Sequence, residues 1–137
     1  MSGSLTRRLR WAAASVVACL VFASFAYAAT PIKVTVSPHT ASHGQRVTLR
    51  GSGWGVIEFC TSRVTLTLKR AAPLKPLPVA TVKLRTGATN SGTFSTTWAL
   101  PASVHTGTRL IVATQTCESG KNGSPHPIIR TTTIRVK

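Results

Sequence analysis

Acidic side chains are almost missing from this chain. Its 137 residues include two carboxylates, Glu58 and Glu118, and no aspartate, against 17 lysines and arginines, which gives a formal net charge of +15. A glycosidase would have to use those two glutamates as its pair, a calcium site normally needs several carboxylates, and an Asp-containing catalytic triad lacks its orienting residue. We therefore expect no catalytic residues, and we expect the glutamates to form weak surface pairs with cations such as Arg63 and Lys121.

Cysteine and histidine are also scarce, and they do not fall in the patterns of known sites. The chain has neither a C-x-x-C nor a G-x-S-x-G motif, so neither a redox or zinc centre nor a serine-hydrolase elbow is indicated. The four histidines lie in expected turns, which favours ordinary loop residues over metal ligands. They are His39, His43, His105 and His126. We expect no metal and no cofactor.

The one long apolar segment stands at the N-terminus. Arg7, Arg8 and Arg10 precede the 15-residue run Trp11 to Phe25, and Ala26-Tyr27-Ala28 follows it. A basic start, a short apolar middle and a small-x-small triplet are typical of a secretory signal peptide, whereas a membrane-spanning helix needs about 20 apolar residues. The sequence predicts a signal peptide over residues 1–28 and a mature protein, residues 29–137, that is extracellular or bound at the cell surface.

Three alternatives for this segment stay open. The signal segment could remain uncleaved as an anchor, and insertion into a membrane is expected only in that case. Val16-Val17-Ala18-Cys19 has the residue types of a lipoprotein cleavage box, although Leu20-Val21-Phe22 continue the apolar run where a polar tether would begin. Arg7-Arg8 resembles a twin-arginine signal, so the export route is open.

Loss of Cys19 with the signal leaves Cys60 and Cys117, 57 positions apart. Two cysteines in an exported domain predict one disulfide, which would add about 4 kcal/mol of stability in the chain-entropy model. The alternative is two buried free thiols.

The mature chain keeps 14 lysines and arginines against the two glutamates, a net charge near +12. Such an excess gives the surface a positive potential that attracts polyanions at low salt, and acidic wall polymers, anionic lipid head groups and extracellular nucleic acid all fit it. The charges are scattered, without a run of four or more, so no specific nucleic-acid recognition is expected. The alternative is that basicity serves solubility or reflects an arginine-rich proteome.

Apolar residues of the mature chain alternate with polar ones in short runs separated by Gly, Pro, Ser and Asn. Period-two alternation of this kind predicts strands, and about seven strands without a helical stripe predict a single antiparallel β-sandwich. The runs are Ile32-Val34-Val36, Val47-Leu49, Val64-Leu66-Leu68, Val82-Leu84, Phe94 to Leu100, Leu110-Val112 and Ile134-Val136.

The order of several short motifs resembles bacterial immunoglobulin-like domains of the IPT/TIG type, from Ile32 to Lys137. The motifs are Val36-Ser37-Pro38, Gly44 followed by Val47-x-Leu49-x-Gly51-Ser52-Gly53-Trp54, Ser91-Gly92-Thr93-Phe94-Ser95, Leu100-Pro101 and Gly107-x-x-Leu110-x-x-Ala113. The resemblance implies a seven-stranded Ig-like sandwich in which Cys60, before the third strand, and Cys117, after the sixth, lie on neighbouring strands and staple one end. Such domains serve as adhesion modules, spacers and accessory domains, so the resemblance constrains function little.

Three residues are candidate ligand contacts. Trp54 either packs over the disulfide at a corner of the core or is exposed as a stacking platform. Lys121 and Asn122 stand in the polar, Gly-rich stretch from Glu118 to Pro127, a loop of the kind that carries binding on a rigid scaffold. We expect a secreted, non-enzymatic module that binds a polyanion or envelope polymer weakly. The alternative is a structural component that pairs through strand edges with itself or another surface protein; the oligomeric state is left open.

Overall fold

The structure is a computed structural model that describes residues 30–56, 59–87, 91–118 and 123–137. Within these ranges the chain is all β and has no helix, as the alternation predicts. The predicted signal peptide falls outside them and stays a prediction. In the described part of the chain we find no helix with the length and apolarity to cross a bilayer. The strands are β1 (Lys33–Ser37), β2 (Thr40–Ala41), β3 (Arg46–Gly55), β4 (Arg63–Leu68), β5 (Leu77–Lys83), β6 (Arg85–Thr86), β7 (Ser91–Ala99), β8 (Gly107–Glu118) and β9 (Pro125–Val136).

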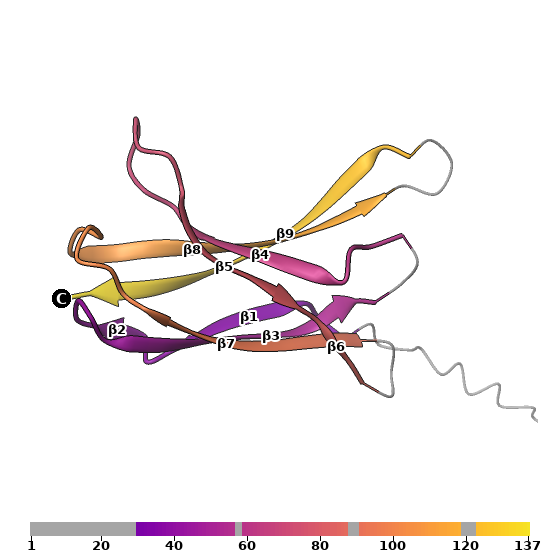
Figure 1. Ribbon diagram of the computed structural model, residues 1–137, viewed down its shortest axis with the longest axis horizontal. Helices are drawn as coiled ribbons and strands as arrows, with labels where there is room; N and C mark the ends of the chain where they lie inside the picture. Colours follow the sequence, from indigo (N-terminus) through magenta and orange to yellow (C-terminus); the bar gives the residue numbers. More distant parts are fainter. Residues whose placement is uncertain (1–29, 57–58, 88–90, 119–122) are drawn as a thin grey trace, which may run out of the picture.

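These strands form two sheets, which Figure 1 shows as two layers. One has the order β1-β3-β7-β6 and the other the order β2-β9-β8-β4-β5. Neighbours are antiparallel except β2 and β9, which are parallel. The chain changes sheet five times: between β1 and β2, β2 and β3, β3 and β4, β5 and β6, and β7 and β8. The two-residue strands β2 and β6 are the additions to the seven strands expected from the sequence.

The core fills the space between the layers. Alternate residues of a strand point to opposite faces of a sheet, so the apolar members of each period-two run are buried together. Trp98, in the alternating run Phe94 to Leu100, pairs with Val47 and shares its face, and it packs against the core but is only partly buried. The central buried residues are Val34, Val36, Val47, Leu49, Val64, Leu66, Leu68, Ile111, Ala113, Ile134 and Val136.

A β-bulge in β3 decides which way Trp54 points. The β3–β7 register shifts between Gly51 and Trp54, and Gly53 has a φ of 74°. Leu49 and Gly51 face the core, so regular alternation would turn residue 54 outward; the extra residue of the bulge resets the phase and turns it inward. Gly51 stands opposite Phe94, whose ring lies over the glycine, so a Cβ built there would clash with Phe94 Cε1.

Candidate anion-binding surface

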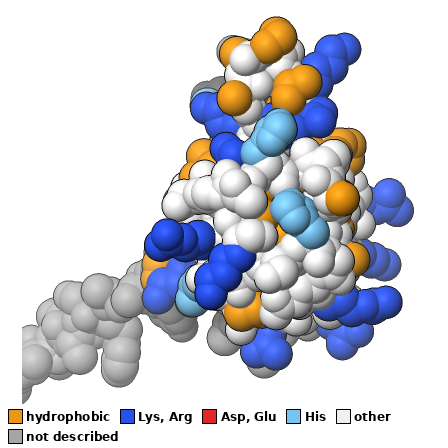
Figure 2. Space-filling model, turned by 90° about the vertical axis from the view of Figure 1, so that its left-hand side faces the viewer, with side chains coloured by type: hydrophobic (Ala, Val, Ile, Leu, Met, Phe, Trp, Pro, Cys, Tyr) orange, Lys and Arg blue, Asp and Glu red, His pale blue; other side chains and the backbone are white. Residues whose placement is uncertain are grey.

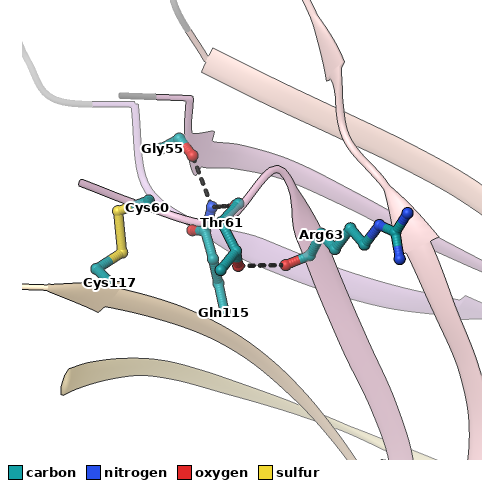
Figure 3. Close-up of a disulfide and its surroundings, with 6 residues drawn as sticks. All are labelled: Gly55, Cys60, Thr61, Arg63, Gln115 and Cys117. Atoms are coloured by element: carbon teal, nitrogen blue, oxygen red, sulfur yellow. Dashed lines mark hydrogen bonds between the residues drawn. A yellow bond between two sulfur atoms is a disulfide. The ribbon is translucent and has the colours of Figure 1, made fainter. Parts of the chain in front are cut away.

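The predicted disulfide is present and closes one end of the fold (Figure 3). Cys60 precedes β4 and forms an isolated bridge with Cys117, which lies inside β8, and their Cα atoms are 3.9 Å apart. Because β4 and β8 are neighbours in the five-stranded sheet, the bond joins adjacent segments of one sheet. The expected pairing is confirmed, with the difference that Cys117 stands in its strand and not after it.

A buried glutamine supports the disulfide from the core side. Gln115 is fully buried, and its Nε2 donates to Gly55 O at 2.6 Å and to Thr61 O at 2.8 Å (Figure 3). Gly55 ends β3 and Thr61 follows Cys60, so one side chain fixes the chain before and after the bridge. These two hydrogen bonds account for a polar residue at this core position, because a buried amide group needs partners.

The sequence candidates at this end are not brought together as a ligand site. Trp54 is 0% exposed, with its ring centroid 6.2 Å from that of Phe94. Its indole therefore has no accessible surface for a ligand, which agrees with the packing alternative and removes Trp54 from the candidate contacts. Lys121 and Asn122 lie outside the described residues, and so does Glu58, so the expected surface pair between Glu58 and a cation stays a prediction.

Within the described ranges, no three His, Cys, Asp or Glu side chains gather in a way that could hold a metal ion. His43 Nε2 lies 2.6 Å from Val104 O, a contact that ties two loops together. His39, His105 and His126 are exposed.

Basic side chains lie on the outer face of each of the two sheets. Thirteen lysines and arginines are described, against the single carboxylate side chain of Glu118. On the four-stranded sheet, Arg50 stands between Thr35 and Ser95. Lys33, Arg46 and Arg85 are exposed in phase with it, on the same face. On the five-stranded sheet, Arg63 stands opposite Lys83, and Arg135 opposite Thr108. One carboxylate cannot balance this charge, so both faces have a positive potential.

Two further arginines lie at the end of the fold away from the disulfide, where they line a pocket of about 160 Å³. Arg70 Nε donates to Lys75 O at 2.7 Å, and Arg109 Nε and Nη2 donate to His105 O and Thr106 O at 2.9 and 2.8 Å. All three acceptors are neutral backbone carbonyls, so the guanidinium groups are held in place while their charge is uncompensated. The pocket is lined by Leu68, Arg70, Ala71, Ala72, Pro73, Leu74, Ser103, Val104, His105 and Arg109.

We call this part of the molecule the loop end, meaning residues 69–76 between β4 and β5 together with residues 103–109. Figure 2 views this side and shows apolar side chains at the projecting tip, lysines and arginines around it, and no acidic side chain among the described residues in view. The alternation pattern marks proline-containing stretches such as residues 73–78 only as breaks between strands, so it did not predict this pocket. The dibasic pair Lys69-Arg70 beside that proline-rich stretch was the available signal.

No family model matches the sequence and no curated protein matches it, so the resemblance to IPT/TIG domains gains no support there. Solved structures similar to this chain include the alkylpurine DNA glycosylase AlkC of Pseudomonas fluorescens bound to DNA with an abasic site analog, at 12% identity over 77% of this chain and 30% of that one, with a TM-score of 0.48. The neutral ceramidase of Pseudomonas aeruginosa matches at 13% identity over 72% and 18% of the two chains, with a TM-score of 0.44. The chain spans less than a third of either protein, and likenesses this distant carry no argument about function.

Proposed function

We propose that this protein is an exported, non-enzymatic binding module that attaches weakly to anionic polymers such as those of a cell envelope. The observation that supports this is the distribution of charge: thirteen described cations spread over both sheets and the loop end, with Glu118 as the one described carboxylate side chain. A broad positive field attracts any extended polyanion, but it lacks the fixed geometry that reads individual sugars or bases.

An Ig-like fold of the IPT/TIG type is part of the proposal. In immunoglobulin constant domains the first, second, fifth and fourth strands share one sheet and the third, sixth and seventh share the other. Without β2 and β5, which have no counterpart among the seven strands of a constant domain, the remaining orders β1-β3-β7-β6 and β9-β8-β4 follow this arrangement. Export after cleavage of residues 1–28 is the other part. The disulfide is consistent with it, because such bonds persist mainly in oxidising compartments.

The test is binding to soluble polyphosphate at increasing salt, with neutral dextran as the control ligand. We expect weak binding that falls by orders of magnitude between about 50 and 200 mM salt, as counterion release requires when several phosphates are contacted. The single substitution Lys83→Gln should weaken binding only modestly. Charge reversal of Lys33, Arg46, Arg50 and Arg85, which share one face, should abolish it. Tight, salt-insensitive binding to dextran or to a protein would contradict the proposal.

Edge pairing is the second candidate. In the described ranges, β9 pairs with β2 only at Arg135 and Val136, so most of its length has no strand on the side away from β8. Pro125, Pro127 and Arg130 interrupt that edge, and proline and charge are the usual devices that prevent edge pairing. Oligomers that grow with concentration and survive high salt would favour this candidate over polyanion binding.

A further inference from the structure

We propose that the loop end docks on an anionic phospholipid bilayer: the tip of the 69–76 loop enters the head-group region, and the pocket between Arg70 and Arg109 takes a lipid phosphate. This rests on the proposed function and names one partner for the charge. Bilayer docking differs from general polyanion binding because it requires one specific end of the molecule and an apolar contact. A soluble polyanion needs neither.

The tip of the loop is apolar and uncovered. The loop projects beyond the two layers at the upper left of Figure 1. Ala71, Ala72, Pro73 and Pro76 are exposed, and Leu74 is 48% exposed. Apolar side chains on a projecting loop gain free energy when they leave water for the boundary between head groups and acyl chains.

A basic collar surrounds this tip. Lys69 and Lys75 are exposed beside it, and Arg70 and Arg109 are half-buried at its base. An apolar tip inside a ring of cations has the composition that binds an anionic membrane surface, where each nearby lysine or arginine strengthens binding about fivefold. A soluble polyanion would engage the cations but leave the Leu74 side chain in water. The combination therefore favours a lipid surface.

The pocket supplies a defined place for one phosphate. Arg70 donates to Lys75 O through Nε alone, so its two Nη groups have no protein partner among the described residues. Arg109 donates through Nε and Nη2, so its Nη1 also has no described protein partner. Both guanidinium groups line the same pocket, whose apolar wall includes the buried side chains of Leu68 and Val104. Guanidinium forks suit phosphate oxygens, and the apolar wall suits the ester carbons of a lipid.

The position of the acidic residue agrees with this orientation. Glu118 lies at the other end of β8 from Gly107. Twelve residues of strand place it roughly 35 Å away from the loop end. A membrane that approaches the loop end therefore meets only cations among the described charged side chains.

Binding to vesicles tests the proposal directly. We would measure co-sedimentation of the purified exported protein with phosphatidylglycerol/phosphatidylcholine vesicles, with phosphatidylcholine vesicles, and its binding to soluble polyphosphate. We expect binding to the anionic vesicles and to polyphosphate, but not to phosphatidylcholine alone. Leu74→Ser should lower vesicle affinity about tenfold, since each methylene-sized group contributes a factor of about four and about half of the three lost groups, by the 48% exposure of Leu74, can enter the bilayer. It should leave polyphosphate binding unchanged.

Matched controls distinguish contacts made by the loop end from attraction by the positive potential of the whole surface. Ile129 is 50% exposed on β9, so Ile129→Ser removes a similar apolar surface elsewhere and should leave vesicle binding unchanged. Lys75→Gln should cost about fivefold on vesicles and Lys83→Gln clearly less. Melting temperatures confirm that each variant is folded. As a positive readout, a tryptophan introduced by Leu74→Trp should shift its emission to shorter wavelength with anionic vesicles and not with polyphosphate.

The possible failures are distinguishable. Polyphosphate binding without vesicle binding, equal loss from Leu74→Ser and Ile129→Ser, or no emission shift would overturn the docking proposal and leave the polyanion function standing. Absence of binding to both probes would overturn both.

Discussion

Replacement of Gly51 by alanine should be among the most destabilising small changes in this domain. Gly51 sits opposite Phe94 at a paired position, and an alanine Cβ would clash with Cε1 and lie 2.5 and 2.6 Å from Cδ1 and Cζ of that ring. Phe94 is 5% exposed and lies beside the fully buried Trp54, so a ring that moves away from the new methyl group has to repack against its neighbours. The glycine is therefore required by the aromatic residue above it.

The magnitude follows from overpacking. Extra methyl groups in a packed core typically cost about 1–3 kcal/mol, and a clash with three atoms of a buried ring belongs at the upper end. We expect Gly51→Ala to lower the free energy of unfolding by about 3 kcal/mol, or the melting temperature by roughly 10–20 °C for a domain of this size. Gly87→Ala is the control, because its new Cβ would meet only Ser91 O, at 3.8 Å; it should cost under about 0.5 kcal/mol.

A double-mutant cycle identifies the cause. Phe94→Ala alone should cost about 3–5 kcal/mol through the cavity it leaves. Without the ring the added methyl group has space, so the double variant should be no less stable than Phe94→Ala alone, a coupling of about 3 kcal/mol. Urea unfolding of the four proteins measures this. Additive effects, or a Gly51→Ala cost close to that of Gly87→Ala, would refute the argument.

Three further predictions concern the disulfide end and the N-terminus. Cys60→Ser should lower the free energy of unfolding by about 4 kcal/mol, because the bridge closes a 57-residue separation; equal urea midpoints of the oxidised protein and the variant would contradict this. Gln115→Leu should cost about 1–3 kcal/mol: Gly55 O and Thr61 O lose their donor, while the buried Gln115 Oε1, which has no partner among the described residues, is removed. A variant as stable as the parent in urea unfolding would show that these two hydrogen bonds add nothing to stability. N-terminal sequencing should show cleavage between Ala28 and Ala29, and an intact Met1 or an acylated Cys19 would disprove the signal-peptide interpretation.

The strands were predictable where alternation ran long enough to show its period. Val64-Leu66-Leu68 and Ile134-Val136 are buried in β4 and β9 as expected. Strands β2 and β6 have two residues each, which is too few to show an alternation. They owe their place to where the chain crosses between sheets, which is a property of the whole fold.

Trp54 shows why a local pattern left two alternatives. Leu49 and Gly51 face the core, so strict alternation along β3 would put residue 54 on the outer face. The bulge at Gly53 reverses this. Gly51-Ser52-Gly53 follows the Val47-Leu49 run, and glycine at such a place is compatible with a break between strands as well as with a bulge inside one. The pocket was harder still, because Arg70 and Arg109 are far apart in the sequence and only the folded loops bring them together.

The arrangement of the first and last strands has a mechanical consequence. β1 begins at the disulfide end, while β2 and β9 are parallel and the C-terminus lies at the opposite end (Figure 1). Tension between an attached N-terminus and a pulled C-terminus would slide β2 along β9, so the bonds from Arg135 N to His39 O and from Lys137 N to Ala41 O would be loaded together in shear. Once they yield, the covalent bridge keeps the 57-residue separation between Cys60 and Cys117 from extending. About 190 Å of contour length then stays hidden until a reductant is added, a difference that single-molecule stretching can resolve.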